Sequence, residues 1–330
     1  MKKKRIAING FGRIGRTLSR ILLSDDRFEI VAINDVSDVK TLAHLFKYDS
    51  VHGKNPLQIS VKDNLLIAKE TVIPFIQKNH PSEIDWKIFQ PDVVVECSGF
   101  FKKRRELEQH ITNGGGKVLL SVPPEDDTIK TIVLGVNDHL MNADDMIISN
   151  ASCTTNNAAP MIFILDKICG IESCYITTVH SYTGDQRLHD APHKDLRRSR
   201  AAALSIIPTT TGAAKALTKV FPHLQNQMGG AGVRVPVPDG SLTDITCIVK
   251  NPLTIEEINL AFKHASQDYL KDILEYTEDP IVSIDVVGNP HSCVFDSQLT
   301  SVIGRMVKVV GWYDNEFGYS SRLRDMLLKM

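Results

Sequence analysis

The sequence predicts an α/β protein of two domains, and three observations support this prediction. Its 330 residues are enough for two substantial buried cores. In the first half, short apolar runs alternate with helical patterns, which is typical of parallel strands joined by crossover helices. In the second half the β-prone runs are longer and helical patterns interrupt them, which favours a mixed sheet with helices on one side.

Five short runs in the first half are candidate strands, because each is rich in Val and Ile and ends at small or polar residues. Between the first two, Leu18, Ile21 and Leu22 follow Ile14 at helical spacing. This strand–helix–strand order predicts a doubly wound parallel sheet. The candidate strands are residues 5–9, 30–34, 93–97, 117–121 and 146–149.

The second half changes character after a boundary that we place near Asn150. We therefore expect a first domain at 1–150, a second at 151–315 and a final helical segment at 316–330. No repeat, low-complexity segment or Pro/Gly-rich linker separates them, so close packing of the domains is expected. The candidate strands here are 175–179, 232–237, 242–249 and 307–312, and the candidate helices are 212–220 and 255–269.

Composition excludes several classes of protein. A formal net charge of −1 argues against a general binder of nucleic acid, since little counterion release would drive binding. The basic start, Lys2-Lys3-Lys4-Arg5, is followed by an apolar run too short for a secretion signal. No apolar run approaches the roughly 20 residues needed to span a bilayer. We expect a cytoplasmic protein.

The six cysteines form no CxxC pair and show no zinc-like spacing, so no metal site or disulfide framework is predicted. Five of them lie in or beside apolar stretches and are interpreted as buried, inert thiols. Those five are Cys97, Cys169, Cys174, Cys247 and Cys293.

A glycine-rich turn points to a dinucleotide site of the Rossmann type. Gly10-Phe11-Gly12-Arg13-Ile14-Gly15 follows a candidate strand and opens a candidate helix, whose N-terminus would face an anion. Asp35 ends the second strand 20 residues after Gly15, where a carboxylate accepts hydrogen bonds from an adenosine ribose. The alternative for Asp35 is a turn or helix-capping role.

Cys153 differs from the other cysteines, because it lies in a polar, hydroxyl-rich segment between a strand and a helix-like run at 158–168. A helix N-terminus favours a thiolate and offers N–H groups to an oxyanion. Pro160 should kink that helix or mark its first turn. His180 ends a strand 27 residues later and is a candidate base for the thiol. The alternative is a capping segment beside a structural histidine.

At these residues the sequence resembles the phosphorylating glyceraldehyde-3-phosphate dehydrogenases, and the resemblance extends from end to end. SNASCTTN together with WYDNE is highly specific. The matching motifs are INGFGRIGR (8–16), YDSVHG (48–53), SNASCTTN (149–156), TTVHSYTGDQ (177–186), IIPTTTGAAKAL (206–217), RVPVP (234–238) and WYDNEFGY (312–319).

The resemblance implies oxidation of glyceraldehyde 3-phosphate to 1,3-bisphosphoglycerate with reduction of NAD, in glycolysis or gluconeogenesis. Cys153 is implied to attack the aldehyde carbon, and His180 to accept the thiol proton. The resulting hemithioacetal becomes a thioester that inorganic phosphate cleaves. No metal is implied. The implied ligands are Thr183 and Arg234 for the substrate's phosphate; Ser152, Thr154, Arg198, Thr211 and Gly212 for the attacking phosphate; and Gly10, Gly12, Arg13, Ile14, Asp35, Ser121 and Asn315 for NAD.

The resemblance also implies a homotetramer in which residues 182–203 run along the subunit interface near the neighbour's cofactor, and a C-terminal helix that returns to the first domain. Neither nucleic acid nor a membrane is required. A preference for NAD over NADP is expected, because Asp35 would repel a 2′-phosphate and the next basic residue, Lys40, comes only later. Pro192 agrees, since NADP-using relatives tend to carry a hydroxyl residue there.

The chain departs from the family pattern at a few positions. Asn157 replaces a second cysteine, which removes one oxidation route. Asn79 stands where many relatives have an arginine near the adenine, and 237–240 differs in a stretch close to the subunit interface.

Two other functions are open. One is an erythrose-4-phosphate dehydrogenase, although relatives of that kind typically lose the Thr-Gly pair that is intact here as Thr211-Gly212. The other is a dinucleotide-binding regulatory or surface-adhesion protein without turnover. The intact set of Cys153, His180, Arg234 and Asn315 argues against it.

Overall fold

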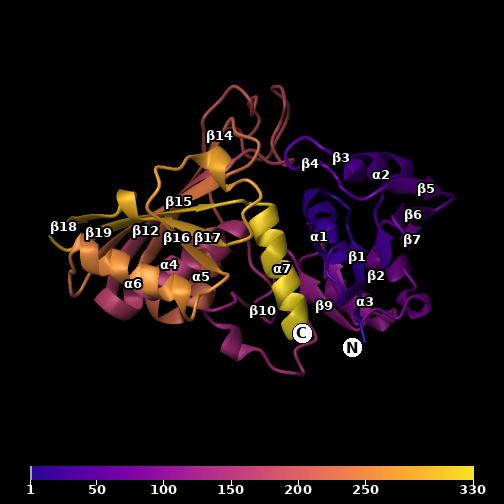
Figure 1. The fold of residues 1–330 in the computed structure, drawn as a ribbon, viewed down its shortest axis with the longest axis horizontal. Coiled ribbons are helices and arrows are strands. Elements are labelled where there is room, and N and C mark those ends of the chain that lie inside the picture. Colours follow the sequence, from indigo (N-terminus) through magenta and orange to yellow (C-terminus); the bar gives the residue numbers. More distant parts are fainter. Residues whose placement is uncertain (1) are drawn as a thin grey trace. The chain divides into compact units, whose positions relative to one another are not determined.

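The computed structural model describes residues 2–330, and these form two compact units (Figure 1). Among the described residues, the first unit consists of 2–132, Leu140–Ala151 and Ser320–Met330, and the second of Val133–His139 and Ser152–Tyr319. The chain passes into the second unit after Ile132 and again after Ala151.

A nine-stranded sheet forms the first unit. Its strands, in spatial order, are β10 (Lys130–Thr131), β11 (Ile147–Ser149), β9 (Lys117–Leu120), β8 (Val93–Glu96), β1 (Lys4–Asn9), β2 (Phe28–Asn34), β7 (Thr71–Ile76), β6 (Leu65–Ala68) and β5 (Ile59–Lys62). Pairing is parallel from β10 to β7 and antiparallel from β7 to β5. The strand order reverses between β1 and β8, so the predicted doubly wound parallel sheet is confirmed. The antiparallel edge was not predicted.

Helices α1 (Arg13–Leu23), α2 (Val39–Lys47) and α3 (Arg104–Thr112) belong to the first unit, as does most of the last helix, and a small hairpin joins β3 (Tyr48–Asp49) to β4 (Gly53–Lys54). Helix α1 follows the predicted helical spacing and buries Leu18 and Leu22. Trp86 is fully buried in a cluster with Ala7 and Val94, from the strands at the centre of the sheet. These contacts fix the strand ends on which the glycine-rich turn depends.

The second unit contains an eight-stranded mixed sheet. The strands are β13 (Ile207–Thr209), β14 (Met228–Val235), β12 (Ile171–Ser181), β15 (Ser241–Val249), β19 (Met306–Tyr313), β17 (Cys293–Asp296) and β16 (Leu274–Thr277), with β18 (Ser301–Ile303) paired to β19. Pairing is parallel between β12 and β14 and between β16 and β17, and antiparallel elsewhere. The predicted mixed sheet is confirmed.

Helices α4 (Cys153–Cys169), α5 (Ala213–Val220) and α6 (Ile255–Gln267) accompany this sheet, and α4 packs on the central strands β12, β15 and β19. Helix α4 begins at Cys153, five residues before the expected run at 158–168, because the Ser152 hydroxyl caps it by accepting from the Thr155 N–H at 3.1 Å. Pro160 lies inside the helix, so it does not mark the first turn.

The last helix, α7, spans Phe317–Lys329 within the final segment expected at 316–330. Asp314 lies just before it, and its Oδ1 accepts the N–H groups of Glu316 at 2.8 Å and Phe317 at 2.6 Å. Within the first unit, the Lys4 ammonium donates to the carbonyl of Leu327 at 2.6 Å and ties the end of α7 to β1. Over residues 2–330, no helix has the length and apolar character needed to cross a bilayer.

Candidate active site

A cavity of about 490 Å³ lies in the first unit at the carboxyl ends of β1, β2 and β8. This is the point where the strand order reverses, and open α/β sheets bind their ligands at such points. Gly10, Gly12 and Asp35 of the predicted site line the cavity, together with Asn9, Asn34, Cys97 and Ser98. Its remaining lining residues are Val36, Lys78, Asn79, Phe100 and Phe101.

The three glycines of the turn serve different purposes. Gly10 has φ +96°, and a Cβ there would lie 2.4 Å from the backbone nitrogen of Ser98. A Cβ on Gly15 would lie 2.1 Å from the carbonyl oxygen of Gly10, so α1 could not approach β1. Gly12, in contrast, has nothing within 4 Å of a Cβ position and no side chain caps α1 there. Open backbone at a helix start fits a pyrophosphate.

Asp35 is held by the glycine-rich turn. Its Oδ2 accepts the N–H of Phe11 at 2.7 Å, and its Oδ1 accepts the N–H of Ser37 at 2.9 Å. The carboxylate is therefore fixed at the mouth of the cavity while its remaining lone pairs can accept ribose hydroxyls. Lys78 lines the same cavity although it is remote from Asp35 in the sequence. The residues that follow Asp35 did not predict this basic side chain, because the first of them with a positive charge is Lys40.

Four predicted cofactor residues do not line this cavity: Arg13, Ile14 and Ser121 of the first unit, and Asn315 of the second. Arg13 forms an ion pair with Asp49 at 2.7 Å. Burial opposes ionisation of Asp49, but the N–H groups of His52 and Val51 and the Arg13 guanidinium lower its pKa to about 2. Ser121 donates its hydroxyl to the carbonyl of Glu96 at 2.8 Å, and Ile14 follows Arg13 in the first turn of α1.

A buried polar network behind the cavity was not predicted. Glu96 is fully buried, and its Oε2 accepts from the Asn9 amide at 2.5 Å and lies 3.1 Å from His110 Nε2. Trp86 donates to His110 Nδ1 at 2.9 Å, which assigns the His110 proton to Nε2. Asn34 donates to Asn9 Oδ1 at 2.7 Å. The network fixes the ends of β1, β2 and β8 against one another.

In the second unit, Cys153 is the first residue of α4. The preceding Ala151 is buried in the left-handed region at φ 56°, a conformation that a non-glycine residue adopts at a cost of about 1–3 kcal/mol. The sharp turn ends β11 and starts α4 within a few residues. As a result the thiol lies at the helix N-terminus, as expected.

His180, at the end of β12, lies beside the thiol. Cys153 Sγ and His180 Nε2 are 3.5 Å apart, and His180 Nδ1 lies 2.8 Å from the Ser181 carbonyl oxygen. Only an Nδ1–H can bond that carbonyl, which leaves Nε2 as the acceptor for the thiol proton. Arg234 Nη1 lies 2.5 Å from His180 Nδ1 and donates to the same carbonyl at 2.9 Å. We take the carbonyl as the acceptor for both donors.

The electrostatics favour a neutral pair. Burial raises the pKa of the Cys153 thiol, against the opposing charge of Arg234 and a hydrogen bond from the Thr154 N–H. Burial and the nearby Arg234 charge lower the pKa of His180 to about 3. The helix N-terminus was expected to favour a thiolate. Desolvation outweighs this effect here, and the pair stands as thiol and imidazole.

Tyr313 and Thr178 belong to the surroundings of this pair, and sequence reasoning missed both as site residues. Tyr313 Oη lies 2.9 Å from Thr154 Oγ1 and 3.1 Å from Thr178 Oγ1, and its ring meets that of His180 edge-on at 6.0 Å. Tyr313 is part of the motif WYDNEFGY. It reaches the His180 ring only because its strand, β19, pairs with β15, which in turn pairs with β12.

Polar groups that suit anions surround the pair. Arg198 donates to Asp185 at 2.6 Å, to Thr209 at 3.0 Å and to the Thr210 carbonyl at 3.3 Å. This places it beside Thr211, whose hydroxyl accepts the Ala213 N–H at 3.2 Å, and Gly212, which precedes α5. Thr183 lies two residues after Ser181, half-buried. The charges of Arg234 and Arg198 both act on His180.

Asn315 lies close to the end of β12 through two serines. Its Oδ1 accepts from Ser181 Oγ at 2.8 Å and from Ser241 Oγ at 2.7 Å. Ser241 Oγ also accepts the Ser181 N–H at 3.1 Å, so its own proton is committed to Asn315. The Asn315 amide nitrogen therefore keeps its two protons for another acceptor, as a carboxamide-binding residue requires.

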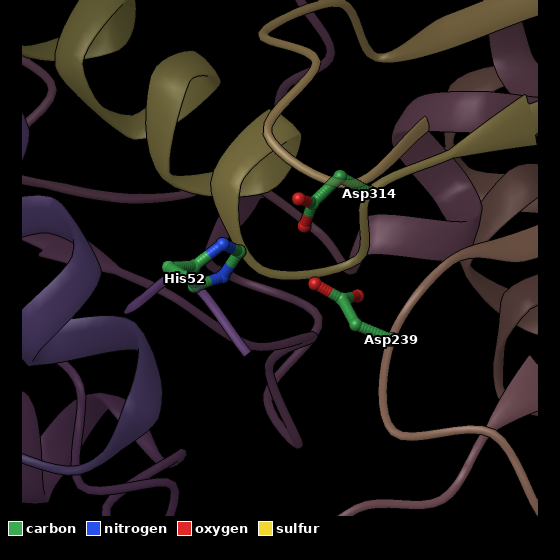
Figure 2. Close-up of side chains that lie close together, drawn as sticks. All are labelled: His52, Asp239 and Asp314. Atoms are coloured by element: carbon green, nitrogen blue, oxygen red, sulfur yellow. The ribbon is translucent and has the colours of Figure 1, made fainter. Parts of the chain in front are cut away.

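Next to this amide lies a pair of buried carboxyl groups. Figure 2 shows Asp239 and Asp314 with their carboxyl groups turned toward each other, and they share a hydrogen bond. Burial, with the neighbouring charges of Asp314 and Glu316, raises the pKa of Asp239 to about 9. Asp239 therefore carries a proton at neutral pH, and it belongs to the 237–240 stretch that departs from the family pattern.

Comparison with known proteins agrees with this arrangement. Residues 4–104 match the family model of the glyceraldehyde 3-phosphate dehydrogenase NAD binding domain, and residues 152–315 match that of its C-terminal domain. Glyceraldehyde-3-phosphate dehydrogenase 2 of Streptomyces avermitilis is 51% identical over 98% of this chain and 97% of its own length. The glyceraldehyde-3-phosphate dehydrogenase of Mycobacterium avium is 48% identical over the same shares. The chain therefore belongs to the glyceraldehyde 3-phosphate dehydrogenase family.

Proposed function

We propose that this chain catalyses the phosphorylating oxidation of D-glyceraldehyde 3-phosphate to 1,3-bisphosphoglycerate with NAD as the hydride acceptor. The observation that carries the proposal is the pair formed by Cys153 and His180, a nucleophile and a base whose Sγ and Nε2 atoms are 3.5 Å apart. Arg234 lies beside the His180 ring. The intact Thr211-Gly212 pair disfavours erythrose 4-phosphate as the main substrate. The reactive pair disfavours a binding protein without turnover.

The first step is addition of the thiol to the aldehyde. Cys153 Sγ attacks the carbonyl carbon, and its proton passes to His180 Nε2, which the Ser181 carbonyl orients through Nδ1. The N–H of Thr154, already hydrogen-bonded to the sulfur, lies at the helix N-terminus and can stabilise the oxyanion. The product of this step is a hemithioacetal on Cys153.

The second step removes a hydride from the carbon of the hemithioacetal, whose oxyanion becomes the carbonyl of a thioester on Cys153 while the proton taken from the thiol stays on His180. NAD, when bound, accepts this hydride. The cavity of the first unit fits its adenosine and pyrophosphate, since Gly12 is open and Asp35 faces the ribose position. Asn315 would hold the nicotinamide carboxamide with the amide protons that the two serines leave available. We infer a preference for NAD over NADP from Asp35, which Lys78 offsets only in part.

The third step consumes inorganic phosphate. One phosphate oxygen attacks the thioester carbon, and the Cys153 thiolate leaves, so the product is an acyl phosphate. We assign Ser152, Thr154, Arg198, Thr211 and Gly212 to the attacking phosphate, and Thr183 and Arg234 to the phosphate of the substrate. The Thr154 hydroxyl is hydrogen-bonded to Tyr313 Oη, so we expect Thr154 to bind the attacking phosphate through its backbone N–H. Forked guanidinium groups and hydroxyls suit tetrahedral oxyanions.

We further propose a homotetramer in the cytoplasm. All six cysteines are free thiols, which favours a reducing compartment. Leu188 and Leu196 of the predicted interface segment, 182–203, are exposed at 74% and 82%, and Leu204, which follows it directly, is exposed at 83%. A subunit interface along this segment would cover these side chains.

The test of the function is an NADH assay with and without inorganic phosphate, using glyceraldehyde 3-phosphate and erythrose 4-phosphate in parallel. Cys153→Ala should lower phosphate-dependent turnover by at least about 10³-fold while NAD binding persists, because only the covalent intermediate is lost. Cys169→Ala, at the opposite end of the same helix, is the matched control and should stay within about twofold of wild type. Phosphate-independent NADH formation, or faster turnover of the four-carbon sugar, would overturn the proposal.

A further inference from the structure

Two cysteines outside the active site lie directly opposite each other in the second unit. Cys174 of β12 and Cys247 of β15 are register partners in an antiparallel ladder, flanked by the pairs Tyr175–Thr246 and Ser173–Ile248. Cys174 is 6% exposed and Cys247 is fully buried. Both thiols therefore point to the same buried face of the sheet and are shielded from bulky reagents.

The backbone geometry of such a pair suits a disulfide. Directly opposed residues of an antiparallel ladder have Cα atoms about 4.5–5.5 Å apart. Disulfides are found with Cα separations of about 4.4–6.8 Å. The two thiols are already in contact, because they share a hydrogen bond. A bond between the two sulfur atoms would need no rearrangement of the strands.

The two thiols are not equivalent. The hydrogen bond from Cys247 lowers the pKa of Cys174, against the effect of burial, and the same bond raises the pKa of Cys247. Cys174, the more exposed of the two, is thus the better nucleophile, and Cys247 is the partner placed to resolve its oxidised form. Asp166 is the carboxylate whose charge acts on both, and its Oδ2 is bound by His223 at 2.7 Å.

We propose that Cys174 and Cys247 form a reversible disulfide when the protein meets a small hydroperoxide. With hydrogen peroxide, the Cys174 thiolate attacks one peroxide oxygen, the O–O bond breaks and a sulfenic acid forms; the other oxygen takes up the proton that Cys174 released and leaves as water. The Cys247 sulfur then attacks the Cys174 sulfur, and the hydroxyl leaves with the Cys247 proton as a second water. Two thiols are oxidised and one hydroperoxide is reduced. The bond would join β12 to β15 upstream of His180 on β12.

This proposal concerns a pair of residues that the catalytic reaction does not use, so it stands or falls independently of the proposed function. The interpretation of both cysteines as inert thiols came from their apolar surroundings, and it did not include their mutual register. Cys169, Cys293 and Cys97 have no cysteine opposite them in the ladders of the described residues.

The experiment uses the full-length Cys153→Ala variant, which removes the reactive catalytic thiol and leaves five of the six cysteines. It is treated with hydrogen peroxide, unfolded, alkylated and analysed by mass spectrometry before and after reduction. We expect the treated protein to lose two alkylatable thiols, and its intact mass before alkylation to be lower by two hydrogen atoms. A linked peptide pair containing Cys174 and Cys247 should be found. The melting temperature should rise on oxidation and return on reduction.

Matched variants identify the bond. Cys174→Ala and Cys247→Ala, each in the same background, should abolish the linked peptide, and Cys247→Ala should leave a sulfenic acid on Cys174 that dimedone labels. Cys169→Ala should leave the link intact. Failure to form the link at peroxide concentrations that oxidise Cys153 in wild type would overturn the proposal, as would a link from Cys174 to Cys169.

Discussion

Arg234 has two effects on the catalytic pair, and they can be separated by mutation. Its guanidinium lies 2.5 Å from His180 Nδ1, and its charge adds to burial in lowering the pKa of His180 to about 3. A phosphate bound to Arg234 would offset that charge and make His180 a stronger base when the substrate is present. Substrate binding would thus activate the base.

Arg234→Ala should therefore raise the pKa of His180 and weaken the binding of the substrate. A charge-assisted hydrogen bond is worth about 1.5–3 kcal/mol, which corresponds to a rise of roughly 10- to 100-fold in the KM for glyceraldehyde 3-phosphate, with little change in the Kd of NAD. The pKa is read from the pH dependence of Cys153 alkylation. Arg305→Ala, which removes the partner of Glu172, is the control. An unchanged substrate KM would place the phosphate elsewhere.

Asp239 makes a second prediction at the scale of a residue. Its pKa is about 9 in the folded chain and about 3.9 in an unfolded chain, so the folded state binds one more proton between these values. The favourable contribution of Asp239 to the free energy of unfolding is fully present below about pH 4 and is lost as the pH rises to about 9. Asp239→Asn removes this term and keeps a hydrogen-bond donor for Asp314.

The variant should accordingly have a flatter stability profile between about pH 4 and pH 9, and a higher melting temperature than wild type at pH 8. Denaturant unfolding at several pH values measures the effect. Asp244→Asn, which removes the β15 partner of Lys308, is the control and should leave the slope as in wild type. A wild-type slope in Asp239→Asn would mean that Asp239 is ionised in the fold.

At the scale of elements, the junction of β1 and α1 determines both packing and cofactor binding. Gly15 and Gly12 separate the two roles, because a Cβ on Gly15 would lie 2.1 Å from a carbonyl oxygen, whereas one on Gly12 meets nothing within 4 Å. Gly15 thus belongs to the contact of the helix with the strand. Gly12 belongs to the cavity wall.

Gly15→Ala should lower both the melting temperature and the affinity for NAD, since the helix must move away from the turn. Gly12→Ala should lower the melting temperature by only a few degrees, because a Cβ there meets no atom and the loss of a glycine N-cap costs about 1 kcal/mol. It should nevertheless weaken the binding of NAD. Thermal unfolding and NAD titration test the pair. Wild-type NAD affinity in Gly12→Ala would mean that the pyrophosphate does not approach this backbone.

At the scale of the whole molecule, the exposed leucines in and beside the predicted interface segment, 182–203, bear on assembly. Leu188, Leu196 and Leu204 are exposed at 74%, 82% and 83%, and a subunit interface would remove these apolar side chains from water. Closed symmetric assemblies are common among soluble proteins.

Light scattering should therefore give about four times the chain mass of 36.7 kDa at micromolar concentration. The double variant Leu196→Asp and Leu204→Asp should lower the mass, because a charge buried at an interface is costly. Leu260→Asp, at a 67% exposed position of α6, is the control. A wild-type mass near 36.7 kDa would refute the tetramer.

The sequence by itself determined the fold class, and it predicted that the glycine-rich turn, Asp35, Cys153 and His180 lie at the ends of strands and helices. These features depend on local order: strand, turn, helix and the residue type at each junction. It placed Cys153 at a helix start, although it set that start five residues too late by not recognising Ser152 as the cap. The sequence did not predict the antiparallel strands at the edge of the first sheet, β5 to β7, because strands as short as four residues show too little hydrophobic periodicity.

Only the tertiary structure decided which distant residues meet. Lys78 reaches the cavity because β7 lies beside β2, and Tyr313 reaches Thr178 because β15 lies between β12 and β19. The register of β12 against β15 places Cys174 opposite Cys247, and the turn before β15 brings Asp239 to Asp314. Strand order and register are set by the packing of the whole sheet, and a shift of one residue would turn each of these side chains to the other face.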